Sequence, residues 1–201
     1  MHRLPEPLSI VVEQLSRLPG LGPKSALRLA MTLLKWPESE TRRLGKNIHD
    51  LRDALRLCSQ CGALAEYDPC PICKDPSREA ESLCLVADWD SLVTIESGGF
   101  YRGYYLILGG LLAPLDNIHP DTLDLALLDR RLAPGTVREI IFALGSTVEA
   151  DSTASFLKSR ILARFPHVTV TRLAQGIPLG SEVRNMDKET LRQSLRFRQN
   201  I

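Results

Sequence analysis

The chain has few aromatic residues and no long hydrophobic run, and both shortages restrict what it can be. Aromatic side chains make up 5% of its 201 residues, and leucine and alanine dominate the apolar set, which favours helices. No stretch approaches the ~18 consecutive apolar residues that a membrane span requires. The first residues, Met1 to Pro7, lack the charged-then-apolar order of a secretory signal. We therefore expect a cytoplasmic protein that makes no membrane contact.

The sequence also lacks the common catalytic motifs. It contains neither the Gly-x-Ser-x-Gly pattern of acyl-transfer enzymes nor the glycine-rich P-loop of nucleotide hydrolases. Its four histidines are scattered, without the spacing of a metal site or a catalytic triad. The sequence therefore lacks the motifs that acyl transfer and P-loop nucleotide hydrolysis require.

Charge is nearly balanced overall, at +1, but it is unevenly distributed along the chain. Residues 1–57 hold ten Lys/Arg against six Asp/Glu, and residues 138–201 hold the same numbers. Residues 58–137 hold only five against twelve. Such a chain can combine a basic binding face with an acidic region for a partner, although ordinary solvated surface would account for the counts equally well.

Four blocks follow one another, and together they predict an α+β protein built from several modules. Residues 1–57 read as a helical, helix-hairpin-helix DNA-binding block, and residues 58–78 as a small four-cysteine zinc finger. Residues 79–174 alternate strands and helices, which predicts a Toprim-like α/β domain with a mainly parallel sheet and helices on both faces. Residues 175–201 read as a Gly/Pro turn followed by a basic helix, an oligomerisation element.

Within these blocks, apolar spacing predicts the elements. In the first block we expect helices over Leu8–Leu18, Ser25–Trp36 (stopped by Pro37) and Glu40–Leu57. In the third we expect strands over Leu83–Ala87, Tyr104–Leu108, Arg138–Leu144 and His167–Leu173, and helices over Asp90–Glu96, Thr122–Leu132 and Ser152–Arg164. The last helix is expected over Asp187–Arg198.

A glycine-containing turn joins the first two predicted helices. Gly20 and Gly22 allow backbone angles and close approach that a Cβ would forbid, and Pro23 suits the first turn of the next helix. The free amides of that helix start can hold a phosphate, and Lys24 and Arg28 lie on the same helical face. The spacing matches the helix-hairpin-helix motif, which predicts DNA binding without sequence reading. The alternative is a helical corner that binds nothing.

Four cysteines lie within sixteen residues: Cys58, Cys61, Cys70 and Cys73. Two Cys-x-x-Cys knuckles can complete a tetrahedron of thiolates around one Zn²⁺ per chain, and four protein ligands leave no position for a catalytic water. The segment has too little apolar content to fold alone, so a metal would supply the folding energy. Cys84, the fifth cysteine, lies in a predicted strand and reads as a small buried side chain.

Three carboxylates follow predicted strands in the α/β block: Asp88, Glu149 and Asp151. A Toprim-type site holds Mg²⁺ with a glutamate after the first strand and an acidic pair later, but Ala87 occupies the position of that glutamate. We therefore expect Asp151 to cap a helix that starts at Ser152, and the acidic pair to face a partner rather than a catalytic metal.

The order of these motifs is similar to that of the bacterial recombination mediator RecR family across nearly the whole chain. The matching segments are Leu18–Ala30, Cys58–Cys73 with Asp75–Arg78, Tyr101–Tyr105, Pro114–Pro120, Thr147–Glu149, Ser152–Ala154 and Gln175–Gly180. Ala87 and the run Glu149-Ala150-Asp151-Ser152 depart from the family pattern, which puts metal binding in question.

The resemblance implies a DNA-repair protein without catalytic activity. It implies a ring-like homo-oligomer, a dimer or tetramer, that encircles DNA and acts with RecO, and in some settings RecF, to help load RecA onto gapped single-stranded DNA. It assigns Lys24 and Arg28 to DNA and Glu149 and Asp151 to the RecO partner. Two other functions stay open: a Mg²⁺-dependent Toprim nuclease or primase, and an interaction scaffold that does not bind DNA.

Overall fold

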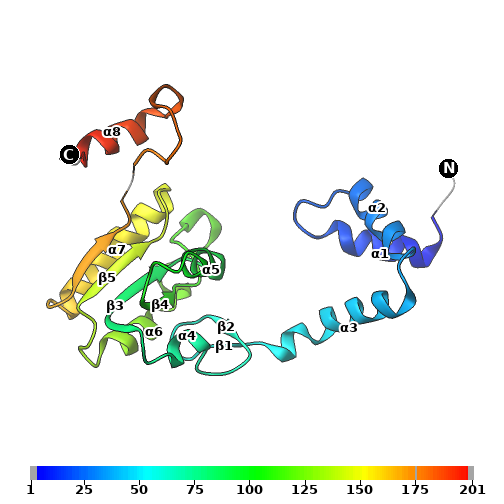
Figure 1. The fold of residues 1–201 in the computed structure, drawn as a ribbon, viewed down its shortest axis with the longest axis horizontal. Coiled ribbons are helices and arrows are strands. Elements are labelled where there is room, and N and C mark those ends of the chain that lie inside the picture. The colour runs from blue at the N-terminus through cyan, green and yellow to red at the C-terminus, as the bar shows by residue number, and fades with distance from the viewer. Residues whose placement is uncertain (1–3, 175, 199–201) are drawn as a thin grey trace. The chain divides into compact units, whose positions relative to one another are not determined.

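The computed structural model describes residues 4–174 and 176–198, and the chain divides into two compact units between Ala54 and Leu55 (Figure 1). We call residues 1–54 the N-terminal unit and residues 55–201 the α/β unit. The first three residues of the predicted hairpin block, Gln175 at the start of the predicted C-terminal block, and residues 199–201 lie outside the described residues. Among the described residues, no helix has the length and apolar content to cross a membrane.

Three helices form the N-terminal unit: α1 (Glu6–Ser16), α2 (Pro23–Leu33) and α3 (Glu38–Ala54). All three were predicted from apolar spacing, but α1 ends two residues and α2 three residues earlier than expected, and α3 also ends three residues early. It stops at Ala54 because the next residues form β1 (Arg56–Leu57), which pairs antiparallel with β2 (Leu64–Ala65).

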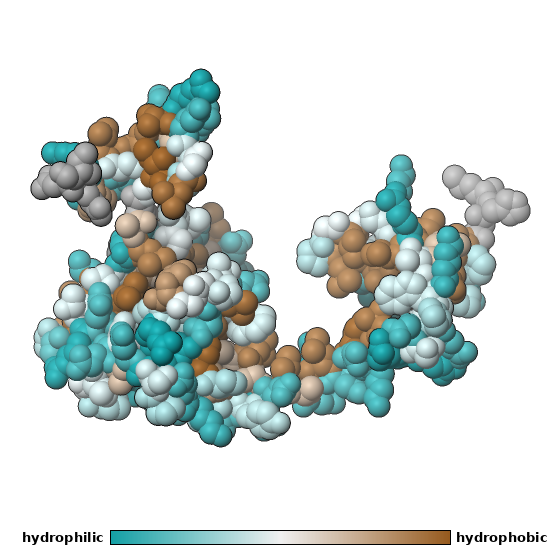
Figure 2. All heavy atoms as spheres, in the orientation of Figure 1, coloured by the Kyte–Doolittle hydropathy of each residue, from teal (hydrophilic) through white to brown (hydrophobic). Residues whose placement is uncertain are grey.

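The core of the N-terminal unit is small. Val12, Ala26 and Ala30 are its buried residues among those described, and two of the three are alanines. Helix α3 buries none of its side chains. Apolar side chains instead cover much of the visible surface of this unit (Figure 2). The exposed ones are Leu4, Ile10, Val11, Leu18, Leu29, Met31, Leu34, Trp36, Leu44, Ile48 and Leu51.

A four-stranded parallel sheet lies at the centre of the α/β unit, as the alternation of strands and helices predicted (Figure 1). Its order is β4-β3-β5-β6, and every neighbouring pair is parallel. The strands are β3 (Glu79–Val86), β4 (Gly103–Ile107), β5 (Glu139–Ala143) and β6 (Thr169–Arg172). The helices are α4 (Pro71–Lys74), α5 (Trp89–Ser97), α6 (Leu125–Leu132), α7 (Val148–Arg164) and α8 (Lys188–Arg196).

The two faces of the sheet are covered by different parts of the chain. Alternate residues of a strand point to opposite faces, and β3 shows the consequence. Leu83 and Leu85 pack with α6 and α7 in the main core, whereas Cys84 and Val86 pack with α5 and the four-cysteine segment. Cys84 is therefore a buried apolar residue, as predicted. The four-cysteine segment is therefore an integral part of the α/β unit, because it covers one face of the sheet.

Two helix starts in the α/β unit differ from the predictions. Helix α6 begins at Leu125 rather than near Thr122, because Pro120–Thr122 form a separate 3-10 turn. Helix α7 begins at Val148 rather than at Ser152, one full turn earlier. The expected C-terminal helix is present as α8, and Asp187 caps its start by accepting a hydrogen bond from the Thr190 backbone N–H at 2.9 Å.

Candidate nucleic-acid interface and metal centre

The turn between α1 and α2 is fixed by a short local sequence. Gly20 has a φ of +79°, a left-handed conformation that glycine adopts without strain. The Leu21 backbone N–H donates to the Leu18 carbonyl at 3.1 Å, with Pro19 and Gly20 between them. Proline followed by a left-handed glycine is the sequence of a type II turn. The prediction that Gly20 is needed for the backbone angle is consistent with this geometry.

Gly22 has a different role from the one its sequence position suggested. Its φ of −74° is open to any residue, and a Cβ built there would meet no atom within 4 Å. The chain itself therefore does not require a glycine at this position. Gly22 is the N-cap of α2 and provides no side-chain acceptor for the first-turn N–H groups. Those amides are left open to an external acceptor.

Two cations lie on the first turns of α2, on the same face of the helix. Lys24 and Arg28 are both exposed, four residues apart. Among the described residues neither forms an ion pair, whereas Arg17, Arg42 and Arg43 of the same unit are each paired with a glutamate. The predicted DNA-binding residues are thus close in sequence and space, and their charge is uncompensated.

The four predicted metal ligands converge on one point. The sulfur atoms of Cys58, Cys61, Cys70 and Cys73 all lie within 4.8 Å of one another, and the Cys61 and Cys70 sulfurs are 3.6 Å apart. A tetrahedron with Zn–S distances of about 2.3 Å has sulfurs about 3.8 Å apart, so the cluster has the size of such a site. Among the described residues it is the one group of three or more Cys, His, Asp or Glu side chains close enough to share an ion.

Backbone geometry shapes the two knuckles. Gly62 has a φ of +75°, which closes the turn after Cys61, and its N–H donates to the Cys58 carbonyl at 2.9 Å. In the second knuckle, the Cys73 N–H points at the Cys70 sulfur at 3.4 Å. Such N–H contacts stabilise the thiolate form of the ligand.

Burial and hydrogen bonding shift the pKa values of three of the four thiols in different directions. Hydrogen bonding, first of all from the Cys73 thiol, lowers the pKa of Cys61 to about 6. Burial raises the pKa of Cys70 to about 11, and the hydrogen bond that Cys73 makes to Cys61 raises the pKa of the Cys73 thiol. A divalent metal binds cysteine as the thiolate, so metal binding would release the protons held by Cys70 and Cys73.

Direct hydrogen bonds hold the four-cysteine segment against the sheet. The Ile107 backbone N–H of β4 donates to the Cys61 carbonyl at 2.8 Å, so a strand is bonded to a knuckle. After the four-cysteine segment, Arg78 forms an ion pair with Glu96 of α5. Its Nη1 donates a hydrogen bond to the Gly103 carbonyl at 3.0 Å. Arg78 has 11% side-chain exposure. The two knuckles and the sheet are therefore parts of one structure.

The acidic residues of the α/β unit are dispersed among separate contacts. Asp88 caps α5 by accepting a hydrogen bond from the Ser91 N–H at 2.8 Å. Asp151 does not cap α7, contrary to the prediction. The N-cap is Thr147, whose hydroxyl accepts from the Ala150 N–H at 3.2 Å, and Asp151 lies inside the first turn, paired with Arg172 at 3.0 Å. The helix starts early because Thr147 supplies the cap.

Glu149, the third carboxylate of this group, is exposed, as are Asp88 and Asp151. Hydrogen bonds from its own backbone N–H and from the Thr147 hydroxyl hold its pKa below the ordinary value. Ala87, at the end of β3, supplies no ligand. In the described part of the chain, the acidic pair and Asp88 do not gather into a metal-binding group.

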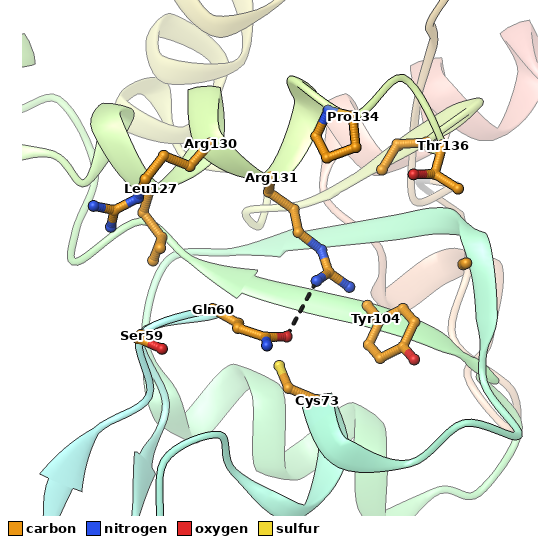
Figure 3. A pocket seen from close by; sticks show the side chains of 11 residues that line it. Ser59, Gln60, Cys73, Tyr104, Leu127, Arg130, Arg131, Pro134 and Thr136 are labelled. Atoms are coloured by element: carbon orange, nitrogen blue, oxygen red, sulfur yellow. Dashed lines mark hydrogen bonds between the residues drawn. The ribbon is translucent and has the colours of Figure 1, made fainter.

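Sequence reasoning missed a second basic site, which lies between the four-cysteine segment and α6. A pocket of about 380 Å³ opens there, and Figure 3 shows Arg131 reaching from α6 toward Gln60, over Tyr104. The Arg131 guanidinium lies 4.4 Å from the Tyr104 ring centre and donates to the Gln60 amide oxygen at 3.4 Å. No local pattern marks this site, because its residues come from three distant segments.

Comparisons with known proteins cover all parts of the chain. Residues 8–52 match the family model of the RecR helix-hairpin-helix, residues 55–75 match that of the RecR four-cysteine zinc finger domain, and residues 81–174 match that of the Toprim domain.

Full-length relatives agree with these matches. The chain is 68% identical over 201 residues to the recombination protein RecR of Nitratidesulfovibrio vulgaris, and 53% identical to that of Maridesulfovibrio salexigens, with both chains covered completely in each case. It is 45% identical to the RecR of Treponema pallidum over 94% of this chain and 92% of that one.

Proposed function

The chain belongs to the RecR family of recombination proteins, and we propose that it serves recombinational repair as a non-enzymatic clamp that binds DNA without reading its sequence. The observation that carries this proposal is the start of α2, where uncapped amides and two unpaired cations face outward together.

The proposed contact is to the sugar-phosphate chain. A helix start with free N–H groups attracts an anion, and Gly22 keeps the approach to those groups clear of any side chain. Lys24 and Arg28 add two positive charges on the same face. Contacts from these groups to phosphates carry no sequence information, so we expect affinity that depends strongly on salt and weakly on sequence.

The metal of the four-cysteine site is structural, and we propose that it is zinc, one ion per chain. Four sulfur ligands would hold the ion without an open position for water. The Ile107–Cys61 hydrogen bond and the packing of Cys58, Cys61 and Cys70 with β3 and β4 support a wider role. Zinc would stabilise both the knuckles and the sheet face that they cover.

We propose that a second copy of the chain covers the exposed apolar surface of the N-terminal unit. Leu44, Ile48 and Leu51 recur along α3 at helical spacing, and this helix buries none of its residues within its own chain. Apolar surface of this kind marks a protein interface. Leu179, Leu195 and Phe197 of the C-terminal segment are exposed as well and support its proposed role in oligomerisation. A dimer or tetramer ring around DNA would multiply weak phosphate contacts into tight binding.

Partners are proposed on the family relationship. RecO, and in some settings RecF, would dock on the α/β unit so that RecA is loaded onto gapped single-stranded DNA. Glu149 and Asp151 are the proposed contact, because both lie exposed in the first turn of α7. We expect Glu149→Lys to weaken RecO binding at least tenfold in a pull-down and in calorimetry, while DNA binding stays normal. A bacterial protein with this role would act in the cytoplasm, where the chromosome lies.

The main alternative function, a Mg²⁺-dependent Toprim nuclease or primase, lacks a supporting geometry. Such an enzyme needs carboxylates that converge on a metal, and Asp88 and Asp151 are engaged in a helix cap and an ion pair. Nicking or primer synthesis that requires Mg²⁺ and is lost in Glu149→Ala would establish the enzyme instead.

DNA binding by the full-length, zinc-loaded chain tests the proposal. We expect the logarithm of the binding constant to fall linearly with the logarithm of salt concentration on duplexes of unrelated sequence. Lys24→Ala/Arg28→Ala should weaken binding at least tenfold and flatten that slope by about 0.9 for each charge removed on duplex DNA.

The matched control removes two charges from α3 of the same unit. Lys46 and Arg52 are exposed like the hairpin pair, so Lys46→Ala/Arg52→Ala should change affinity no more than about twofold. Equal losses in the two double variants, or wild-type protein that ignores DNA at low salt, would contradict the proposal. A DNA-independent scaffold would then be the better description.

A further inference from the structure

We propose that the pocket between the four-cysteine segment and α6, here called the junction pocket, is a second contact for the DNA phosphate chain. The inference rests on the proposed DNA-binding function and adds a site that lies outside the hairpin. Among the residues that line the pocket are Arg130 and Arg131, and no carboxylate is among them. The lining therefore has two basic side chains and no carboxylate, and Cys73 is the lining residue that would carry negative charge as a metal-bound thiolate.

The carboxylate next to these two arginines in sequence does not neutralise them. The carboxylate next to them in sequence, Asp129, is occupied by Arg160 at 2.6 Å and also by Arg164, both from α7. In the described part of the chain, Arg130 and Arg131 take part in no ion pair. The two adjacent guanidiniums are thus not paired with Asp129, which α7 already occupies.

Arg131 is held in place before any ligand arrives. Its guanidinium stacks over the Tyr104 ring, and the Tyr104 hydroxyl in turn donates to the Asp75 carbonyl at 3.0 Å, which fixes the ring. One N–H of Arg131 is used on Gln60. A guanidinium has five donors in a planar fork that suits a phosphate, so most of them remain for a ligand. A preorganised donor loses less side-chain entropy when it binds.

Arg130 supplies the second, more accessible charge. It is exposed, and Figure 3 shows it leaving α6 on the side of Leu127, away from Arg131. A polyanion passing the mouth of the pocket could contact Arg131 inside and Arg130 at the rim through successive phosphates. A compact anion would reach only one of them, so a nucleic acid strand fits the pair better than a small ligand does.

Salt titrations of full-length, zinc-loaded protein on single-stranded and duplex oligonucleotides test the site. Arg131→Gln should lower affinity severalfold and reduce the slope of log affinity against log salt by about 0.9 on duplex or about 0.7 on single strands. Arg130→Gln should have a similar or smaller effect. This second variant should fold normally, because Arg130 is exposed and outside the network that fixes Tyr104. Combined with Lys24→Ala/Arg28→Ala, the losses should add.

The control is Arg138→Gln, which removes the same charge from an exposed position of the same unit. Arg138 lines a different pocket, together with Glu79, Glu81 and Glu139, where acids outnumber it. Its loss should leave affinity and salt slope unchanged. Zinc content and melting temperature are measured for every variant, because Cys73 also lines the junction pocket.

The outcomes separate the two proposals. If wild-type protein binds DNA and Arg130→Gln and Arg131→Gln bind with wild-type slopes, the junction pocket is overturned and the hairpin proposal stands. If wild-type protein does not bind DNA, both fail. If Arg131→Gln loses zinc and affinity together while Arg130→Gln behaves as wild type, Arg131 stabilises the four-cysteine segment rather than binding DNA. The inference is then wrong. Selective loss of affinity for polyglutamate, with DNA binding unchanged, would point to an acidic protein partner and also overturn it.

Discussion

The two units of the chain use their apolar side chains in opposite ways. In the α/β unit, large residues such as Leu85, Leu106 and Leu157 are fully buried between the sheet and its helices. In the N-terminal unit, the fully or nearly buried positions are Val12 and two alanines, while residues as large as Trp36 and Leu34 are exposed. The α/β unit therefore buries its large apolar side chains within a single chain, whereas the N-terminal unit leaves many of its own exposed.

The difference indicates that the α/β unit is stable by itself, whereas the unit with the proposed DNA-binding residues is not. Burial of apolar area contributes about 25 cal/mol per Å², so a core of one valine and two alanines, with Leu8, Leu15 and Leu27 partly buried around it, supplies less than the main core of the α/β unit. We infer that the N-terminal unit, which carries Lys24 and Arg28, depends on a second copy for its stability. The α/β unit depends on its own sheet and on the metal. Four perturbations of decreasing size should distinguish the two units.

Metal removal should give the largest effect and should be confined to the α/β unit. Binding of a structural zinc is worth on the order of 10 kcal/mol, and the knuckles pack with Val86 and Tyr105 on one sheet face. Cys61→Ser should therefore lose the ion and unfold the four-cysteine segment, with exposure of that face. Elemental analysis and hydrogen exchange measure both. Retention of one zinc per chain with unchanged protection of β4 would contradict this prediction.

Paired leucine truncations compare the two units directly. Leu157→Ala removes a fully buried side chain from the main core and should cost about 2–5 kcal/mol in unfolding free energy. Leu29→Ala removes a side chain that is 42% exposed within its own chain and should cost at most about 0.5 kcal/mol in a dissociated chain. Denaturant melts at low protein concentration measure both. Equal costs would show that the N-terminal unit has a closed core of its own.

A charge placed on α3 tests whether its apolar face is an interface. Ile48 is 66% exposed in the single chain, so Ile48→Asp should leave the helix intact while it opposes burial against a second copy. We expect the native mass to fall toward that of one chain, 22.4 kDa, in light scattering. Lys46→Asp, at an exposed polar position of the same helix, serves as the control and should keep the assembly. An unchanged mass for Ile48→Asp would remove this face from the interface.

The smallest effect concerns the start of α7. Thr147→Ala removes the N-cap and should cost about 1 kcal/mol. Asp151→Asn breaks an exposed ion pair with Arg172 and should cost less than about 0.5 kcal/mol. Thermal melts of the two variants would rank them. The reverse order would mean that Asp151, rather than Thr147, holds the helix start.

Local patterns predicted much of the fold, the hairpin turn and the four-cysteine cluster. The Cys-x-x-Cys spacing identified the four residues whose sulfurs converge, and proline with glycine identified the turn before α2. Three strands of the sheet were predicted from short apolar runs, and β6 from its alternating β-branched residues. The cap of α7 was misassigned because Asp151 and Thr147 are both good N-caps, and the choice between them depends on where the preceding loop ends.

Contacts between distant segments could not be predicted. Nothing near Cys61 in the sequence shows that its carbonyl accepts a hydrogen bond from Ile107, so the docking of the four-cysteine segment on the sheet was missed. The junction pocket was missed for the same reason, since Gln60, Tyr104 and Arg131 meet only after folding. Helix α3 was expected to extend to Leu57 because the pairing of β1 with β2 has no signal in helical spacing.

Hydrogen exchange of the full-length chain at several protein concentrations tests most directly whether the N-terminal unit is completed by a second copy. We predict that amide protection in α1, α2 and α3 falls as the protein is diluted below its dissociation range. Protection in β3 and β5, which form the centre of the sheet, should stay constant. Protection of the N-terminal unit that is independent of concentration and as strong as that of the sheet would contradict the claim.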